Sequence, residues 1–251
     1  MKRSAAAVNQ EFYDEFWRSC PDFSRYNPGV LHRRREILRL LRSVPHREVL
    51  DVGCGDGELI MWLRSVLEPG TSFVGADLSP EVVADNAKRL PFAHFHALDL
   101  EQASLADSFD AVVCTEVVEH LDERPRALRN LASMVAPGGH LVLTCPTGKL
   151  HATEKNFGHI SHPSPRELRG QLVATGLEVV SMSSWGFPLY TALKYATNVN
   201  PAWALKNFAN TEYTPTAKLV SKALYYVNML NPPSTPLGCQ LFVLARKPAE
   251  R

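Results

Sequence analysis

One glycine-rich turn constrains the fold of this chain more than any other feature of its sequence. Residues 49–52 form a short apolar run that predicts a buried parallel strand, and Leu59 begins the apolar pattern of a helix. The turn between them contains three glycines at alternate positions, Gly53, Gly55 and Gly57. Glycine permits positive φ angles and lets the backbone approach a ligand closely. Such a turn, from a parallel strand into a helix, is where α/β sheets bind nucleotide-like cofactors.

The spacing of these glycines separates two kinds of cofactor-binding turn. The dinucleotide fingerprint G-x-G-x-x-G needs glycine at position 58, where this chain has Glu58, and this disfavours an NAD-dependent dehydrogenase. The sequence has Asp51 followed by Gly53, Gly55 and Gly57 instead. That pattern resembles motif I of the class I S-adenosylmethionine-dependent methyltransferases.

An acidic residue at the end of the second predicted strand agrees with this resemblance. Residues 72–78 predict that strand, and Asp77 stands at its end, one strand–helix–strand unit after Asp51. In such a unit an acidic residue accepts the two hydroxyls of a ribose. Ser79 before Pro80 is the better cap for the next helix, so Asp77 stays available for a ligand.

The third predicted strand, residues 92–98, is also followed by a carboxylate. Because the ends of consecutive parallel strands meet at one edge of a sheet, Asp99 is expected on the same rim as Gly55 and Asp77. A carboxylate there can accept the exocyclic amine of adenine, with Leu100 against the ring. An exposed loop aspartate is the alternative.

Later segments resemble further motifs of the same family. Residues 109–114 predict a fourth strand, and residues 115–121 after it resemble motif IV. A Pro-Gly-Gly turn at 137–139 precedes a fifth strand at 140–145, which is also typical of the family. The resemblance implies S-adenosylmethionine as cofactor, contacted by Asp51, Gly53, Cys54, Gly55, Asp77, Leu78, Asp99, Leu100 and Cys114.

The whole pattern predicts a doubly wound α/β fold with a mostly parallel seven-stranded sheet and helices on both faces. Residues 164–175 predict a helix, and 177–183 and 238–246 predict the last two strands. An aromatic stretch between those strands is too long for a plain connector, so we expect a helical insertion that caps the substrate or forms an interaction surface. The expected divisions are an N-terminal helical lid at 1–45, a cofactor-binding core at 46–184, the insertion at 185–237 and the last core strand at 238–251.

Two helices are expected before the glycine turn. Residues 9–19 have an aromatic face, and Tyr13 and Trp17 are expected either to pack on the domain or to close as a lid over the cofactor. Residues 32–42 combine an apolar stripe with a face of arginines. We expect that face to be solvated, and contact with RNA or anionic lipid is the alternative.

Polar side chains after the fourth strand predict the reacting centre. Glu116, Glu119 and His120 have i, i+3 and i+4 spacing, which places them on one face of a helix. His159 and His162 follow the fifth strand and are expected to reach the same rim. We predict His120 and His159 as catalytic residues, because histidine is the usual base for a hydroxyl acceptor, and His162 as a substrate contact.

The same residues suit a divalent metal ion. The carboxylates of Glu116 and Glu119 and the imidazoles of His120 and His159 are suitable ligands for Mg²⁺ or Mn²⁺. The Glu-x-x-Glu-His pattern with a later histidine resembles two metal-using groups, the small-RNA 3′-terminal 2′-O-methyltransferases and the ubiquinone-pathway O-methyltransferases. Their later histidine lies in a different local sequence. In the alternative without a metal, Glu119 forms a cap or an ion pair and His120 alone acts as the base.

Composition limits the partners and the compartment. The formal net charge is +1 over 251 residues, so no global field favours DNA or RNA. The five cysteines are scattered without a C-x-x-C pair, as expected of reduced thiols in the cytoplasm. The first residues lack the apolar core expected of a signal peptide, and no apolar run reaches the length of a membrane span. Peripheral contact with a membrane stays open.

Together these patterns predict a methyltransferase that uses S-adenosylmethionine. We expect O-methylation of a small or lipid-linked biosynthetic molecule by in-line transfer, since an aromatic insertion suits a partly apolar acceptor. One alternative is an RNA 2′-O-methyltransferase, which the Glu/Glu/His pattern favours and the near-neutral charge disfavours. Another is a cofactor-binding scaffold or partner subunit that does not methylate.

Overall fold

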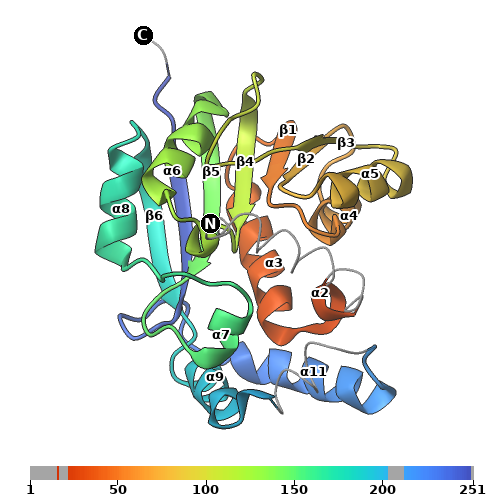
Figure 1. Ribbon diagram of the computed structural model, residues 1–251, viewed down its shortest axis with the longest axis vertical. Helices are drawn as coiled ribbons and strands as arrows, with labels where there is room; N and C mark the ends of the chain where they lie inside the picture. Colours follow the sequence, from red (N-terminus) through yellow and green to blue (C-terminus); the bar gives the residue numbers. More distant parts are fainter. Residues whose placement is uncertain (1–15, 17–21, 203–211, 250–251) are drawn as a thin grey trace, which may run out of the picture.

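The computed structural model describes residue 16 and residues 22–202 and 212–249 of the 251-residue chain. The helix expected at 9–19, with Tyr13 and Trp17, lies outside these residues except for Phe16. The described part is built around one central sheet with helices on both sides (Figure 1).

Within the described residues, seven strands form a single sheet, as expected. They are β1 (Glu48–Val52), β2 (Ser72–Asp77), β3 (His94–Ala97), β4 (Phe109–Thr115), β5 (Val135–Pro146), β6 (Glu178–Trp185) and β7 (Gln240–Arg246). Their order across the sheet is β3-β2-β1-β4-β5-β7-β6. The pairs from β3 to β5 are parallel, whereas β7 is antiparallel to both of its neighbours. The sheet is therefore mixed, and the carboxyl ends of its parallel strands meet at one edge.

Helices cover both faces of this sheet, as expected for a doubly wound fold. The α-helices of the described residues are α2 (Phe23–Tyr26), α3 (Pro28–Leu41), α4 (Glu58–Val66), α5 (Pro80–Arg89), α6 (Arg124–Ser133), α7 (Ala152–Asn156), α8 (Pro165–Val173), α9 (Leu189–Val199) and α11 (Pro215–Asn228). α6 and α8 share one buried core with the sheet, and α3 and α4 share a second core on the opposite face.

The sequence of β1 explains the two cores. Successive side chains of a strand point to opposite faces, so Leu50 and Val52 join the core with α6 and α8, and Val49 joins the core with α3 and α4. A strand covered on both faces needs apolar side chains on both. Asp51 is a polar exception within this run, and it is buried as well.

Local sequence also explains where several helices begin. The Ser79 hydroxyl accepts a 3.1 Å hydrogen bond from the backbone N–H of Val82, and Pro80 occupies the first position of α5, as predicted. Ser164 caps α8 in the same way. The N-cap of α4 is Gly57, which has no side chain to form a cap and has φ 68°. This left-handed residue leads the glycine turn into the helix.

The turn expected at 137–139 is wrong in one respect. β5 runs through these residues, and its pairing with β4 changes register from Phe109↔Val135 to Ala111↔His140. The extra residues form a bulge within the strand instead of a connection between two elements. A Cβ atom at position 139 would lie 2.9 Å from the carbonyl oxygen of Phe109, which explains the glycine there.

Helices α9 and α11 lie between β6 and β7 in the chain. α11 packs on α2 and α3, and α9 packs on α7 and α11. The Trp185 ring at the end of β6 stacks on the imidazole of His32 in α3, with ring centroids 3.6 Å apart. Beyond α11, the Asn231 side chain accepts a 2.7 Å hydrogen bond from the backbone N–H of Leu189. These contacts hold α9 and α11 near the carboxyl end of the sheet (Figure 1).

The helices of the described residues are shorter than a membrane span. α3 and α11 contain 14 residues each. A span needs roughly 20 consecutive, mainly apolar residues. Within the ranges that the structure describes, no helix combines that length with sufficient apolar character.

The contact between the end of β6 and Gly238, two residues before β7, gives a test of this packing. A Cβ atom at Gly238 would lie 2.4 Å from the carbonyl carbon of Ser184 and 2.6 Å from the backbone nitrogen of Trp185. Because a strand backbone cannot move aside without losing its pairing, we expect Gly238→Ala to lower the free energy of unfolding by about 1–3 kcal/mol. Chemical denaturation measures this difference.

A second alanine variant serves as the control. Nothing lies within 4 Å of a Cβ atom added at Gly170 in α8. Gly170→Ala is therefore expected to raise the free energy of unfolding by roughly 0.5–1 kcal/mol, because alanine favours a helix interior over glycine. Equal stability of the two variants would contradict the packing described for β6 and β7.

Candidate functional site

A cavity of about 500 Å³ opens at the carboxyl ends of the parallel strands. Residues that follow β1, β2, β3 and β4 line it, and residues of α2, α3, α9 and α11 complete its wall. The predicted site residues that line it are Asp51, Gly53, Cys54, Gly55, Asp77, Leu78, Asp99, Leu100, Glu116, His120 and His159. The structure therefore brings together most of the residues that the sequence singled out.

Asp77, at the end of β2, is held by two backbone N–H groups. Its Oδ2 accepts a 2.9 Å hydrogen bond from Gly55, and its Oδ1 accepts a 3.0 Å bond from Ser79. The carboxylate thus links the glycine turn to the start of α5 while it lines the cavity. A carboxylate fixed at this place can accept the hydroxyls of a ribose.

Asp99, after β3, lies on the same rim. Its Oδ1 accepts a 3.0 Å hydrogen bond from the backbone N–H of Glu101. Leu98 and Leu100, on either side of it in the chain, are largely buried and also line the cavity. A carboxylate between two apolar side chains suits a flat ring that carries an amine, such as adenine.

Asp51 is buried at the end of β1 and is only 1% exposed. Neither side-chain oxygen has a hydrogen-bond partner among the residues that the structure describes. Burial, and then the negative charges of Asp77 and Asp56, raise the pKa of Asp51 to about 7. A buried carboxylate without partners is unfavourable unless a ligand supplies a donor or a positive charge. The cavity is therefore suited to a cationic group at this position.

The glycine turn passes too close to the residues after β4 to carry a side chain. Gly53 has φ 74°, and a Cβ atom there would lie 2.3 Å from Cγ2 of Val117. The backbone N–H of Gly53 also donates a 2.7 Å hydrogen bond to the carbonyl oxygen of Ala76 in β2. Both the left-handed backbone and the close approach require glycine here.

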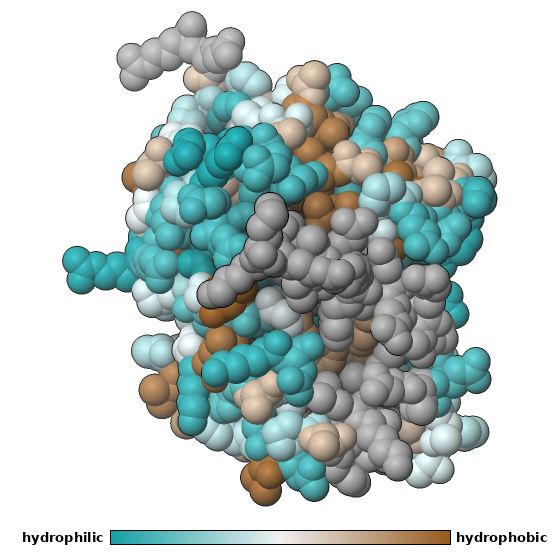
Figure 2. Space-filling model, viewed as in Figure 1, coloured by the Kyte–Doolittle hydropathy of each residue, from teal (hydrophilic) through white to brown (hydrophobic). Residues whose placement is uncertain are grey.

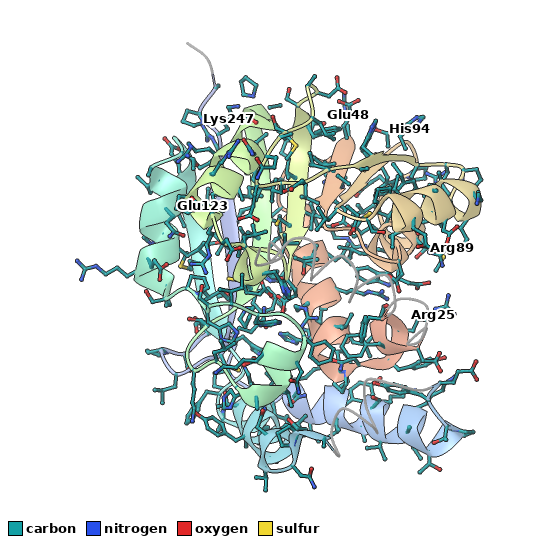
Figure 3. All side chains as sticks on the ribbon, viewed as in Figure 1. Arg25, Glu48, Arg89, His94, Glu123 and Lys247 are labelled. Atoms are coloured by element: carbon teal, nitrogen blue, oxygen red, sulfur yellow. The ribbon has the colours of Figure 1, made fainter. Side chains whose placement is uncertain are left out.

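Glu58, which stands where the dinucleotide fingerprint needs glycine, forms ion pairs with two arginines. Arg25 of α2 and Arg89 of α5 lie on the same side of the molecule (Figure 3). Nη2 of Arg25 is 2.7 Å from Oε1 of Glu58, and Nη1 of Arg89 is 3.9 Å from the same oxygen. Arg89 also donates a hydrogen bond to the carbonyl oxygen of Asp56. Glu58 therefore anchors the first turn of α4 to two neighbouring segments.

The two cysteines predicted to contact the cofactor have different surroundings. Cys54 is largely buried but lines the cavity. Cys114 in β4 is 0% exposed, belongs to the core shared with α6 and α8, and is absent from the cavity lining. The structure gives Cys114 a packing role in place of the predicted contact.

The expected helical face of Glu116, Glu119 and His120 is wrong. Glu116 has a left-handed backbone with φ 56°, and a single 3₁₀ turn follows it in place of an α-helix. Its Oε1 accepts hydrogen bonds of 2.9 Å from the Thr144 hydroxyl and 2.8 Å from the Gln240 amide. These bonds hold Glu116 against β5 and β7, outside the group that the other two residues form.

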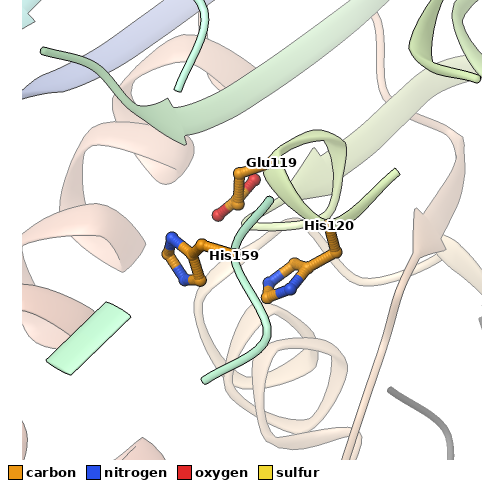
Figure 4. Close-up of side chains that lie close together, drawn as sticks. All are labelled: Glu119, His120 and His159. Atoms are coloured by element: carbon orange, nitrogen blue, oxygen red, sulfur yellow. The ribbon is translucent and has the colours of Figure 1, made fainter. Parts of the chain in front are cut away.

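Glu119, His120 and His159 lie close together (Figure 4), and one ligand atom from each is within 4.8 Å of the other two. Glu119 is fully buried, and in the described part of the chain neither of its oxygens has a hydrogen-bond partner. Burial raises the pKa of Glu119 well above its usual value. A buried carboxylate without hydrogen bonds, beside two imidazoles, is a donor set that suits a divalent transition-metal ion.

Both imidazoles of this group are neutral near pH 7. Burial lowers the pKa of His120 to about 4, and burial with the neighbouring histidines lowers that of His159 to about 2. Nδ1 of His159 lies 3.0 Å from Nε2 of His162. His162 lies beside Glu154 and is not part of the cavity lining. Neutral imidazole is the form that binds metals, whereas a pKa near 4 makes a weak general base at neutral pH.

The arginine-rich helix does not face solvent throughout, contrary to expectation. Arg34 of α3 is buried, and both Arg33 and Arg34 line the cavity. Nη1 of Arg33 lies 3.6 Å from Oε2 of Glu116. Arg34 shares its side of the helix with the buried Ile37 and Leu41, at i+3 and i+7. This spacing in the sequence indicates that Arg34 faces the protein interior. The inward arginines also weaken the argument for an RNA-binding face.

Aromatic and basic residues from distant segments complete the wall. The ring centroids of Phe16 and Phe23 are 5.2 Å apart, and those of Phe16 and Phe157 are 5.6 Å apart. All three rings line the cavity. Lys194 of α9 also lines it and forms a 2.5 Å ion pair with Glu154. Phe16 belongs to the aromatic segment expected at 9–19, whereas Phe157 and Lys194 gave no signal in the sequence, because only the tertiary fold brings them to the cavity.

The fold and the site together define a class of protein. Carboxylates at the carboxyl ends of β1, β2 and β3, a glycine turn after β1 and a final antiparallel strand are the features of a Rossmann-like domain for S-adenosylmethionine. A family model described as a methyltransferase domain matches residues 24–182, which is more than half of the chain. The chain belongs to this family, one of the class I S-adenosylmethionine-dependent methyltransferases.

Curated relatives carry names of methyltransferases with different acceptors. Trans-aconitate 2-methyltransferase of Deinococcus radiodurans is 29% identical over 58% of this chain and 58% of its own length. A ubiquinone biosynthesis O-methyltransferase of Alkalilimnicola ehrlichii is 32% identical over 43% of this chain and 45% of its own. A mitochondrial protein of the same name from Schizosaccharomyces pombe is 26% identical over 85% of this chain and 73% of its own length. The chain spans about half the length of the first two relatives.

Solved structures share the fold at low sequence identity. The N-methyltransferase NodS of Bradyrhizobium japonicum, in complex with S-adenosyl-L-homocysteine, has a TM-score of 0.59 at 19% identity, over 96% of this chain and 98% of that one. The cyclase SpnF has a TM-score of 0.59 at 18% identity, over 87% and 81%. At these identities the likeness concerns the fold alone, and one fold can support different chemistry.

The unpartnered carboxylate of Asp51 predicts that affinity for S-adenosylhomocysteine depends on pH. Asp51, with a pKa of about 7, is half protonated near neutral pH in the unliganded protein. The ammonium group of the ligand favours the ionised form, so binding releases a proton, and the affinity is expected to rise about tenfold between about pH 6 and pH 8. Calorimetry in buffers of different ionisation enthalpy measures both quantities.

Two variants separate Asp51 from other carboxylates. Asp51→Asn removes the titrating group and is expected to weaken binding and to flatten its pH dependence. Asp85→Asn, at an exposed position of α5, is the control and is expected to keep the wild-type profile. A wild-type affinity independent of pH would contradict the role given to Asp51.

Proposed function

We propose that this protein transfers a methyl group from S-adenosylmethionine to an oxygen atom of a small, partly apolar acceptor. One observation carries the proposal: a single cavity contains the carboxylates of Asp51, Asp77 and Asp99 and also His120 and His159. The carboxylates suit the cofactor, and the imidazoles lie where an acceptor would react. Two relatives are named as O-methyltransferases of ubiquinone biosynthesis, which agrees with oxygen as the acceptor atom.

The strand order supports one direction for the cofactor. Asp99 follows β3, Asp77 is the last residue of β2 and Asp51 is the last but one of β1, and these strands are neighbours in the order β3-β2-β1-β4. Asp99 would accept the adenine amine, Asp77 the ribose hydroxyls and Asp51 the ammonium group. The sulfonium and its methyl group would then lie toward the end of β4, where the segment with Glu119 and His120 begins.

The chemistry needs positioning more than activation of the methyl donor. The acceptor oxygen attacks the methyl carbon in line with the carbon–sulfur bond, and the bonding electron pair moves to sulfur, which leaves as neutral S-adenosylhomocysteine. A sulfonium cation and an oxygen anion neutralise each other in this step. An apolar wall such as Phe16, Phe23 and Phe157 therefore favours the reaction, because charges are lost as it proceeds.

The proton of a hydroxyl acceptor must leave before or during transfer. His120 lines the cavity and can accept it, but its pKa of about 4 makes it a weak base for an ordinary hydroxyl. A divalent metal ion would lower the pKa of a hydroxyl bound to it. Glu119, His120 and His159 would hold such an ion, whereas Glu116 is engaged by Thr144 and Gln240. Two imidazoles favour Mn²⁺ over Mg²⁺ as the occupant.

A methyl-transfer assay tests the proposed reaction. We expect the labelled methyl group of S-adenosylmethionine to pass to members of a panel of phenols, catechols and carboxylic acids. Asp99→Ala removes the adenine contact, which is remote from the reacting methyl group, so KM for the cofactor is expected to rise about tenfold with little change in kcat. Asp107→Ala, at an exposed loop position, is the control.

The outcomes of that assay distinguish the alternatives. Binding of S-adenosylhomocysteine without methylation of any acceptor in the panel would favour a cofactor-binding scaffold over the proposed reaction. Failure of the wild-type protein to bind S-adenosylhomocysteine would contradict the cofactor site itself.

Binding of Mn²⁺ tests the metal site without any measurement of activity. We expect the electron paramagnetic resonance signal of free Mn²⁺ to fall when the protein is added. Loss of a direct ligand in Glu119→Gln or His159→Ala should weaken binding by about tenfold or more, since even indirect partners of metal ligands contribute that much. Glu178→Gln, an exposed carboxylate at the start of β6, is the matched control. Equal binding by all four proteins would show that the ion lies elsewhere.

A further inference from the structure

Helix α11 presents apolar side chains outward. The exposed apolar positions of the helix and the residues just after it recur at helical spacing, and five of them are Leu219, Val220, Tyr226, Val227 and Leu230. We name these five residues the α11 outer stripe. Leu219 is 68% exposed and Leu230 is 76% exposed. A surface helix normally buries such a stripe against its own domain.

The inner side of α11 is polar where an apolar face would be expected. Ser221 and Asn228 are 3% and 2% exposed, and Ser221 lines the cavity. The start of the helix is fixed by Lys218, whose Nζ lies 3.2 Å from Oδ2 of Asp22 and 4.5 Å from the ring centroid of Tyr26. These contacts fix the rotation of the helix about its axis. The outer stripe is therefore exposed because of how α11 packs, and it is available to a partner.

Two further apolar side chains are exposed near the ends of the 185–237 segment's elements. Val199 at the end of α9 is 86% exposed, and Leu237 before β7 is 63% exposed. α9 packs directly against α11. Figure 2 shows separate apolar side chains among hydrophilic ones at the lower edge of the molecule, which is the end where α9 and α11 lie in Figure 1. The α11 outer stripe and Val199 thus come from two helices that pack on each other.

The charges around the stripe favour an anionic lipid surface as the partner. Residues 185–237 contain four lysines and a single acidic residue, Glu212. Two of these lysines, Lys194 and Lys218, form ion pairs with Glu154 and Asp22. α11 itself has Lys218 and Lys222 and no acidic residue. No further acidic residue occurs until Glu250. Lys222 is exposed on α11, beside the stripe in sequence. Apolar helix faces flanked by lysine bind the interface of membranes that contain anionic lipids.

The same two helices form part of the cavity wall. α11 contributes Ser221 and Leu224 to the lining, and α9 contributes Leu193 and Thr197. One side of α11 therefore faces the cavity while the other carries the outer stripe. A partly apolar molecule held in a bilayer would have a short path from the lipid to this cavity.

We propose that α11 and the end of α9 dock on the surface of an anionic lipid bilayer, with the outer stripe inserted at the interface. This is peripheral binding of an amphipathic helix that lies along the membrane plane. The proposal goes beyond methyl transfer and does not depend on it, because lipid binding is measured without cofactor or acceptor.

Co-sedimentation with lipid vesicles tests the proposal on the full chain. The wild-type protein is expected to bind vesicles of phosphatidylcholine with phosphatidylglycerol, and to bind vesicles of phosphatidylcholine alone more weakly. The double variant Leu219→Ser/Leu230→Ser should lower the partition coefficient about tenfold, because two buried aliphatic side chains are lost from the interface. Lys222→Gln should lower it about fivefold on anionic vesicles only.

A matched control places the same change on another surface. Val173 in α8 and Val180 in β6 are each 56% exposed and lie outside α9 and α11. Val173→Ser/Val180→Ser is expected to bind vesicles as the wild type does. Thermal unfolding by circular dichroism shows whether each variant remains folded, and sedimentation equilibrium gives its oligomeric state.

Three results would overturn the proposal. The first is a wild-type protein that stays unbound with both kinds of vesicle. The second is equal binding by the wild type and by a folded Leu219→Ser/Leu230→Ser variant, which would place the lipid contact elsewhere. The third is a wild-type dimer that binds no vesicles and becomes monomeric in that variant, which would assign the outer stripe to a second copy of the chain.

Discussion

The contact between the glycine turn and the segment after β4 determines the geometry of the whole site. Gly53 leaves no room for a Cβ atom beside Val117, and its positive φ angle is the backbone conformation that brings the turn there. Val117 lies between Glu116, whose backbone is also left-handed, and the turn that carries Glu119 and His120. The cofactor side and the acceptor side of the cavity are thus built on one packed contact. A change at either segment is expected to move the other.

Two buried carboxylates without hydrogen bonds show what this site requires from its ligands. Asp51 and Glu119 are both almost fully buried, and within the described residues neither has a hydrogen-bond partner for its carboxylate oxygens. Such groups reduce stability in the unliganded protein, because charge or unpaired polar atoms are held away from water. A cationic cofactor group beside Asp51 and a divalent ion beside Glu119 would satisfy both. The cost in the unliganded state is consistent with a site organised for its ligands before they bind.

The sequence predicted well which strand-end residues line the cavity, and only in part how the residues after β4 are arranged. Gly55, Asp77 and Asp99 were predictable because parallel strands end at one edge, so local strand pattern determines which residues meet there. The helical face expected for Glu116 failed because its hydrogen bonds to Thr144 and Gln240, on distant strands, outweigh the local spacing. Lys194 and Phe157 gave no signal, since only tertiary packing brings them to the cavity. The spacing of Arg34 from Ile37 indicates an inward-facing arginine, but the many arginines of this helix suggested a solvated face instead.

The structure of the protein in complex with S-adenosylhomocysteine is the most direct test of the central claim. The ribose hydroxyls are predicted to lie within hydrogen-bond distance of Asp77, the adenine amine near Asp99 and the ammonium group near Asp51. The sulfur atom is predicted to face the side of the cavity that holds His120. A ligand bound in the reverse direction, with its ribose away from Asp77, would contradict the account of how this cavity works.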